Sequence, residues 1–235
     1  EDCFSKRGDE IACVILEPVV GNMGVVAPAD GFLETCRELC SKYETLLIFD
    51  EVITGFGRVG KAFAAERLGV TPDIITSAKG LTNGTVPMGA VFVKDSIHEA
   101  FMQGSGQGIE LFHGYTYSGH PAACAAALAS LDIYEKEKLF ERGAALSPYF
   151  LDKVFELQDL DAVTDIRGYG LIAGIDVAAG DVPGARGTQI QKDLFWNGLH
   201  VKFTADTGIV APPLIAEKEH IDEIVEMLRE KLAEI

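Results

Sequence analysis

Apolar segments bounded by turn residues alternate, along the first half of the chain, with a segment of helical periodicity. Four of the apolar segments have the length of buried strands, and between the first two lies an amphipathic stretch typical of a helix. The predicted strands cover residues 11–20, 45–52, 73–78 and 87–93, and the predicted helix covers residues 29–43. This alternation indicates an α/β fold with a mostly parallel sheet.

The second half of the chain has a different pattern, which begins with an Ala-rich helical segment over residues 121–140. Pro121 suits the first position of a helix, where its missing N–H costs nothing. Beyond this helix we expect a helix near 146–157, strands near 165–175 and 199–204, an exposed loop over 177–187 and an acidic helix from Glu217. We therefore predict part of a large sheet domain over residues 1–140 and a small α+β domain over residues 141–235.

Composition narrows the classes of function. The chain has 235 residues, of which 48% are hydrophobic and 24% charged, as in ordinary globular enzymes. No apolar run reaches the length of a membrane helix, so we expect no membrane partner. The formal net charge of −16 repels phosphate backbones, and we therefore expect no nucleic-acid partner.

The cysteines suggest a reducing compartment. They number five, and no Cys-x-x-Cys pair or zinc-like Cys/His spacing is present. The first residue is Glu1, and no basic start followed by an apolar stretch indicates a signal peptide. We expect a cytoplasmic protein without a metal site, in which His113 and His120 have structural roles.

Two phosphate-binding motifs fit the segment from Gly55 to Gly60 only in part. It has the G-x-G-x-x-G spacing of a dinucleotide-binding turn, but Asp73 precedes the next strand, whereas a ribose-binding acid would end it. It also resembles a P-loop up to its last position, where Ala62 lacks the hydroxyl that would bind magnesium. We reject both interpretations, and we expect Lys61 to be a solvated surface lysine.

A carboxylate and a lysine follow two of the predicted strands. Asp50 comes directly after the apolar residues 46–49, and Lys79 comes just after the strand predicted at 73–78. Ligands of open α/β sheets bind at the carboxyl ends of strands, so the two side chains could meet in one cleft. Judged from the charges alone, a structural ion pair is the more common explanation.

Several longer segments favour a ligand-binding cleft over a structural ion pair. The segments LEPVVGNMGVVAP, LLIFDEVITGFGRVG, SAKGLTNGTVPMGAVFV, ELFHGYTYSGHPAACAAALASLDIY, DIRGYGLIAGIDVA and TGIVAPPLIAEKEHID resemble class III pyridoxal-phosphate-dependent aminotransferases. The resemblance covers nearly the whole chain and is nearest to the omega-amino-acid group, the β-alanine:pyruvate aminotransferases. It implies the aspartate aminotransferase-like fold, known as fold-type I, with pyridoxal 5′-phosphate as the cofactor.

The resemblance also implies roles for four residues. Asp50 holds the place of the aspartate that pairs with the protonated pyridine nitrogen, and Lys79 that of the Schiff-base lysine. Val52 lies in the position of an apolar side chain that packs on the cofactor ring, and we expect it on the same side of an extended strand as Asp50. Thr116 matches a threonine that reaches the cofactor phosphate of a neighbouring subunit, which implies a homodimer with the site at its interface. Without the resemblance, Val52 would be ordinary core and Thr116 a polar loop residue.

Two further residues are expected at the substrate. Glu17 resembles a glutamate near the substrate pocket. Lys202 stands where the nearest relatives have an arginine that clamps the substrate carboxylate. Because a lysine lacks the planar fork that grips a carboxylate with two bonds, we expect weaker discrimination for carboxylate-bearing amines.

The implied activity is ping-pong transfer of an amino group from an omega-amino acid such as β-alanine, or from an amine, to a keto acid such as pyruvate. Family members carry a further N-terminal region, with a Gly-rich phosphate-binding turn, before the segment that starts at Leu16, and we expect the chain to be the C-terminal portion of a longer enzyme. Two alternatives remain open. One is another class III activity, such as 4-aminobutyrate or amine transamination or an aminomutase, and the other is an inactive fragment that serves as an interaction module.

Overall fold

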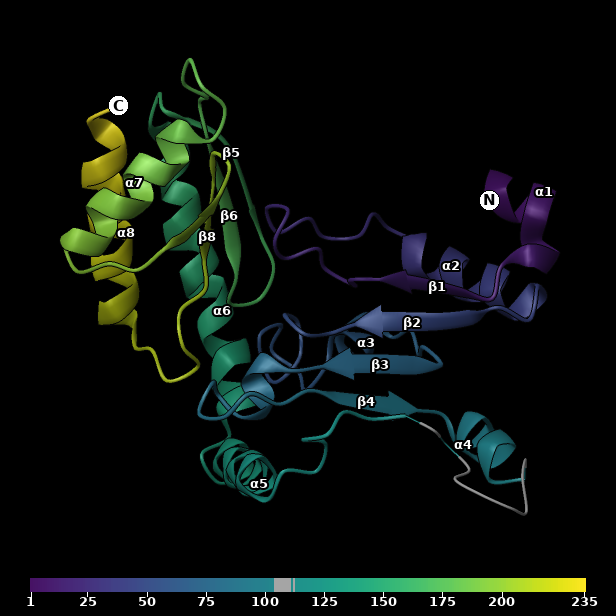
Figure 1. Cartoon of the computed structure of the whole chain (residues 1–235). Coiled ribbons are helices and arrows are strands. Elements are labelled where there is room, and N and C mark those ends of the chain that lie inside the picture. The colour runs from purple at the N-terminus through teal and green to yellow at the C-terminus, as the bar shows by residue number, and fades with distance from the viewer. Residues whose placement is uncertain (104–110, 112) are drawn as a thin grey trace.

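The structure is a computed structural model that describes residues 1–103, 111 and 113–235. It contains two four-stranded sheets, which follow one another along the chain (Figure 1). In the first sheet, β1, β2 and β3 are parallel and β4 is antiparallel to β3. Its strands are β1 (Cys13–Leu16), β2 (Leu46–Asp50), β3 (Ile74–Ser77) and β4 (Ala90–Val93). The mostly parallel sheet predicted for the first half is confirmed.

Several short helices lie in this part of the chain, and α2 makes apolar contact with the sheet. Helix α2 packs on β2 because Leu33 and Cys40 on its apolar side meet Leu47 and Phe49 of the strand. The helices of this part are α1 (Asp2–Arg7), η1 (Gly8–Glu10), α2 (Phe32–Lys42), α3 (Ala64–Leu68), η2 (Lys79–Leu81) and α4 (Asp95–Met102). The predicted helix over 29–43 is therefore present.

The two edge strands of the first sheet are more exposed than the sequence suggested. Ile15 on β1 is 61% exposed, and Val91 and Phe92 on β4 are 55% and 45% exposed. The prediction that residues 11–20 and 87–93 are buried strands is correct for the strands and wrong for their burial. An edge strand has a neighbour on one side only, which leaves much of these side chains exposed even where one of them, Phe92, packs edge-to-face on Phe63.

The second sheet is antiparallel and has the strand order β5-β6-β8-β7. Three helices cover one of its faces and enclose a continuous apolar core, in which Phe150, Ile175 and Ile221 are almost completely buried (Figure 1). The elements are α6 (Leu139–Phe155), η3 (Glu156–Asp159), β5 (Val163–Gly168), β6 (Ala173–Val177), α7 (Ala185–Trp196), β7 (Lys202–Thr204), β8 (Thr207–Val210) and α8 (Lys218–Ala233). This α+β arrangement and the C-terminal helix after Glu217 agree with the sequence.

Three details of the second half differ from the prediction. The strand region expected near 165–175 is the hairpin β5–β6, which extends beyond these bounds at both ends, and Gly170 turns the chain between its strands with a φ of +65°. The expected loop over 177–187 ends inside α7, and the sequence did not predict α7 or β8. A short hairpin strand and a helix with a weakly apolar face leave little periodicity to detect.

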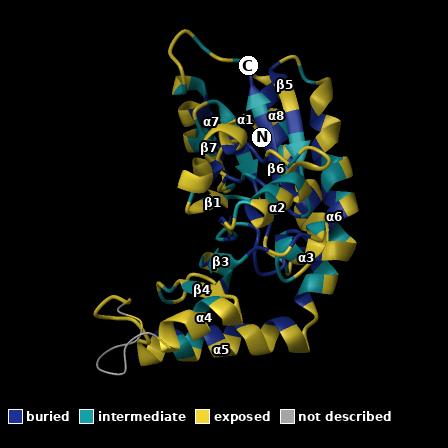
Figure 2. Ribbon diagram, turned by 90° about the vertical axis from the view of Figure 1, so that its right-hand side faces the viewer, coloured by how far each residue is buried: buried dark blue, intermediate teal, exposed yellow. Residues whose placement is uncertain are grey.

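The two sheets are connected through α5 (Pro121–Lys136) and α6. The helix predicted over 121–140 ends at Lys136, because Lys138 takes a left-handed conformation with a φ of +51° before α6 begins. Much of α5 is exposed, whereas the core of the second sheet is buried (Figure 2). The division into domains at residue 140 stays a prediction.

Within the residues that the structure describes, no helix combines the length and the apolar character needed to cross a bilayer.

Candidate functional site

Two neighbouring parallel strands bring Asp50 and Lys79 to the same edge of the first sheet. Asp50 is the last residue of β2 and lies opposite Thr76 of β3. Lys79 begins the short helix η2, two residues after β3 ends. The expected meeting of a strand-end carboxylate and a strand-end lysine is therefore present in the fold.

The backbone at Lys79 is held in an unusual conformation. Its φ is +47°, a left-handed value that costs a non-glycine residue roughly 1–2 kcal/mol. Neighbouring groups hold this turn in place: the Tyr134 hydroxyl donates a 2.6 Å hydrogen bond to the Gly80 carbonyl, and a Cβ on Gly80 would lie 2.7 Å from Phe56. Strained residues of this kind cluster at functional sites.

A cavity of about 710 Å³ opens beside Lys79, between the two sheets. It is lined by residues from both halves of the chain, and none of the described lining residues is acidic. The polar and charged side chains of the wall are Arg58, Lys79, Asn83, Tyr134, His200 and Lys202, and Val52 belongs to its apolar part. With the cations Arg58 and Lys202, the titratable amine of Lys79 and no carboxylate in its wall, the cavity favours anionic ligands.

The electrostatics of this cavity act on the amine of Lys79. Partial desolvation lowers the pKa of Lys79, the nearby ammonium of Lys202 lowers it further, and the carboxylates of Asp50 and Glu17 oppose both effects. The net shift is downward, so more of the amine is neutral, and able to act as a nucleophile, than in a free lysine.

Val52 lies in the cavity wall, but not for the reason that the sequence suggested. Strand β2 ends at Asp50, and Val52 belongs to the turn that follows. The Asp50 carboxylate accepts a 3.0 Å hydrogen bond from the Val52 N–H, which folds the chain back as Asp side chains commonly do in turns. The expectation of an extended strand through Val52 is therefore wrong, although the residue still lies beside Lys79 in the cavity.

Lys202 reaches the cavity from β7 of the second sheet. Its ammonium donates a 2.7 Å hydrogen bond to the side-chain oxygen of Asn22, which belongs to the loop after β1. The partner of Lys202 is a neutral amide, and no salt bridge to Lys202 occurs among the described residues, so its positive charge is not neutralised by the protein. No pattern in the sequence pointed to Asn22.

Glu17 and Thr116 lie outside the described wall of the cavity. Glu17 follows β1, and its carboxylate accepts a 3.0 Å hydrogen bond from the Gly21 N–H, which closes the loop that carries Asn22. Its charge still raises the pKa of Lys79, so it lies within electrostatic reach. Thr116 lies in an exposed turn just before α5. Its expected contact with a neighbouring subunit stays a prediction.

The segment from Gly55 to Gly60 joins the two halves of the molecule. A Cβ on Gly57 would lie 2.6 Å from Phe140, and one on Gly60 would lie 3.1 Å from Ala144, so both glycines allow close packing against α6. Between them, Arg58 donates two 2.7 Å hydrogen bonds to the carbonyls of Leu171 and Pro212. Close packing therefore accounts for these glycines without a bound phosphate.

Arg58 is a wall residue that the sequence analysis did not identify. Burial lowers the pKa of Arg58 from its ordinary value to about 10, and the guanidinium is still charged at neutral pH. An arginine between glycines in an apolar stretch was the available signal, since a buried cation requires partners.

Glu51, next to Asp50, has a structural role. It is fully buried and accepts hydrogen bonds from the backbone N–H groups of Ala64 and Ala65, at 2.5 and 2.8 Å, and from the Thr54 hydroxyl. Desolvation raises the pKa of Glu51, and these hydrogen bonds oppose the shift. Of the two adjacent carboxylates, Glu51 caps α3, whereas Asp50 binds the Val52 N–H and acts through its charge on Lys79. Lys61, as expected, is a surface residue paired with Glu66 at 3.3 Å.

The donor set can be compared with the needs of pyridoxal phosphate. A carbonyl-bearing cofactor needs a lysine amine that is neutral more often than usual, and its protonated ring nitrogen needs a carboxylate. Lys79 has the lowered pKa, and Asp50 lies close enough for its charge to act on Lys79. A cavity of about 710 Å³ gives ample room for a ligand of this size. The residues present therefore fit the group.

Comparisons with known proteins agree with this site. The chain is 51% identical over 226 residues to the omega-aminotransferase of Caulobacter vibrioides, covering 96% of this chain and 52% of the relative. It is 43% identical to the beta-alanine–pyruvate aminotransferase of Pseudomonas aeruginosa, covering 94% of this chain and 50% of the relative. The chain spans about half the length of the curated relatives that it matches.

A solved structure confirms the fold class predicted from the sequence. The (S)-enantioselective omega-transaminase from Thermomicrobium roseum superposes with a TM-score of 0.92 at 38% identity, over 99% of this chain and 53% of that one. The family model for class-III aminotransferases matches residues 1–232. Pyridoxal 5′-phosphate is the cofactor of these enzymes. The predicted family is thus confirmed, and the chain belongs to the class-III aminotransferases.

Proposed function

We propose that the protein containing this chain transfers an amino group from an omega-amino acid or an amine to pyruvate, with Lys79 as its catalytic lysine. The observation that carries the proposal is that Lys79 and Lys202 line one cavity, with the Asp50 carboxylate within electrostatic reach of Lys79, together with the lowered pKa of Lys79. This arrangement also argues against the structural ion pair, since no salt bridge between Asp50 and Lys79 occurs in the described residues.

Each residue has a defined part in this proposal. Lys79 binds the cofactor through its neutral amine and then, once released, moves a proton at the substrate carbon. Asp50 holds a proton on the ring nitrogen, and Val52 packs on the ring. When bound, pyridoxal phosphate supplies an electron-accepting ring that stabilises negative charge at the substrate carbon. Lys202 attracts the substrate carboxylate into the cavity, and Glu17 acts on Lys79 through its charge.

Two classes of amino donor fit the site. A relative that acts on beta-alanine and pyruvate supports an omega-amino acid donor. Lys202 also favours a second candidate, an amine without a carboxylate, because a lysine grips carboxylates less selectively than an arginine does. We further propose that two copies of the chain meet at the site, with Thr116 of one copy contacting the cofactor phosphate of the other.

Reductive trapping tests the proposal directly. The protein is incubated with one equivalent of pyridoxal phosphate and reduced with borohydride, and the modified lysine is identified by peptide mass mapping. We expect the label on Lys79, and Lys61 serves as the exposed internal control. Lys79→Arg should abolish specific labelling, whereas Lys61→Arg should leave it unchanged. Equal labelling of the two lysines would overturn the assignment and favour the inactive fragment.

A further inference from the structure

The loop that carries Asn22 is pressed against the second sheet at a contact that only glycines allow. A Cβ on Gly174 of β6 would lie 2.3 Å from the Gly24 carbonyl oxygen, closer than real contacts permit. Gly24 has a φ of +100°, and a Cβ there would lie 2.6 Å from the Arg167 guanidinium. The two halves of the chain therefore touch backbone to backbone at this point.

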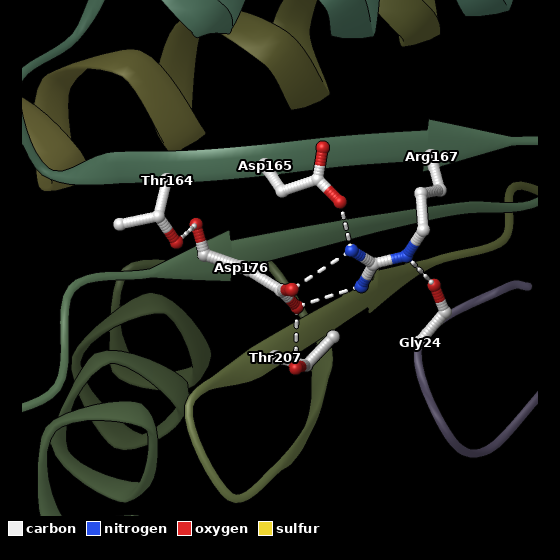
Figure 3. Close-up of polar contacts among 6 residues, drawn as sticks. All are labelled: Gly24, Thr164, Asp165, Arg167, Asp176 and Thr207. Carbon is white, nitrogen blue, oxygen red and sulfur yellow. Dashed lines mark hydrogen bonds and ion pairs between the residues drawn. The ribbon is translucent and has the colours of Figure 1, made fainter.

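Arg167 of β5 links this contact to three strands of the second sheet (Figure 3). Its Nε donates a 2.7 Å hydrogen bond to the Gly24 carbonyl, and its two terminal nitrogens each donate a 2.8 Å bond to the Asp176 carboxylate of β6. One of these nitrogens also contacts Asp165. The Thr207 hydroxyl of β8 donates a 2.6 Å bond to Asp176. A bidentate arginine–carboxylate pair fixes both orientation and distance.

Two segments position Lys202, the loop that carries Asn22 and the strand pair β7–β8, and the Arg167 network contacts both of them. Asn22, which accepts a hydrogen bond from the Lys202 ammonium, lies two residues before Gly24. Strand β7 carries Lys202 and is paired with β8, where Lys202 lies opposite Ile209 and Thr207 forms the last pair. Arg167 thus anchors the loop on one side of Lys202 and, through Asp176 and Thr207, the strand on the other.

We propose that Arg167 is a positioning residue, which fixes the Asn22 loop on the second sheet and so holds the Lys202 ammonium in the cavity beside Lys79. The structural link rests on the contacts alone. Its importance for substrate binding rests on the proposed function, in which Lys202 attracts the substrate carboxylate.

The test measures how strongly Lys202 acts on Lys79. The groups whose charges act on Lys79 are Lys202, Asp50 and Glu17. Arg167 anchors the loop that contacts Lys202 and that Glu17 closes, and a Lys202→Gln background separates the two contributions. The rate at which acetic anhydride labels Lys79 over a range of pH, measured by mass spectrometry without cofactor, reports how often the amine is neutral. Arg167→Met should reduce the labelling of Lys79 at a fixed pH below its pKa about threefold, because the Lys202 ammonium moves away.

Three further variants make this result specific. Arg229→Met is the control, since Arg229, like Arg167, binds a carboxylate (Asp159, 2.8 Å) and a carbonyl (Glu156, 2.7 Å), but within the second half of the chain. It should leave Lys79 labelling unchanged. Asn22→Ala, at an exposed position, should act in the same direction as Arg167→Met without risk to the core. In a Lys202→Gln background, Arg167→Met should have no additional effect.

The outcomes separate this proposal from the proposed function. If Arg167→Met and Asn22→Ala, both folded by circular dichroism, label Lys79 at the parent rate, Arg167 does not position Lys202. An additive effect in the Lys202→Gln background overturns it as well. Since the measurement uses neither cofactor nor substrate, its failure leaves the proposed amino transfer standing, and reductive trapping at Lys79 decides that separately.

Discussion

Lys202 of β7 and Lys79 of η2 line the same cavity although they lie in different halves of the chain, and the charge of Lys202 contributes to the lowered pKa of Lys79. The Lys202 ammonium thus makes the Lys79 amine easier to deprotonate, because a neighbouring positive charge disfavours the protonated form of an amine. The same charge is available to an anionic ligand, since the contact of Lys202 within the protein is the neutral side chain of Asn22.

The charges around Lys79 predict opposite effects of two substitutions. Lys202→Gln removes a cation that lowers the pKa of Lys79, so the pKa should rise and the amine should react more slowly at a fixed pH. Asp50→Asn removes an anion that raises this pKa, so the amine should react faster. Competitive acetylation followed by mass spectrometry measures both, with Lys61 as the internal reference. Shifts of the same sign in both variants would contradict this description of the site.

Replacing Lys202 by arginine should improve the binding of carboxylates. Because a guanidinium can donate two parallel bonds to a carboxylate, Lys202→Arg should lower the KM for β-alanine and for pyruvate, by roughly tenfold. The KM for an amine donor without a carboxylate should change little, which provides the control substrate. Unchanged KM values for β-alanine and pyruvate would show that residue 202 does not contact the carboxylate.

Glu51 should matter for stability. Glu51→Ala leaves the N–H groups of Ala64 and Ala65 and the Thr54 hydroxyl without their acceptor in a buried environment, which should lower the free energy of unfolding by about 2–4 kcal/mol. The exposed Glu66, paired with Lys61 at 3.3 Å, is the control, and Glu66→Ala should cost less than about 0.5 kcal/mol. Urea unfolding followed by circular dichroism compares the two, and equal midpoints would exclude the capping role.

Arg58 should stabilise the contact between the two halves of the chain. Arg58→Met removes both hydrogen bonds to the Leu171 and Pro212 carbonyls, at a cost of about 2–3 kcal/mol. Arg67→Met, on the exposed side of α3, should have little effect. Hydrogen exchange followed by mass spectrometry should show faster exchange at Leu171, whose N–H donates to the Arg58 carbonyl. Parent-like exchange there would mean that the Arg58 side chain does not hold this contact.

The sequence by itself determined the fold class and the family, and it supplied the two residues, Asp50 and Lys79, on which the proposed site is centred. Strand periodicity placed Asp50 and Lys79 after neighbouring strands, and long matching segments named the cofactor. These signals are local, because side-chain alternation and short motifs depend on residues close together in the chain.

Only the tertiary structure decided how the site is assembled. It showed the turn that brings Val52 into the wall, the different roles of Asp50 and Glu51, and the contact between Asn22 and Lys202. Asn22 and Lys202 are 180 positions apart, and no local pattern encodes which distant side chain will accept a hydrogen bond. That choice follows from the packing of two sheets, which allows the backbone of Gly24 to touch Gly174 and places Arg167 between them.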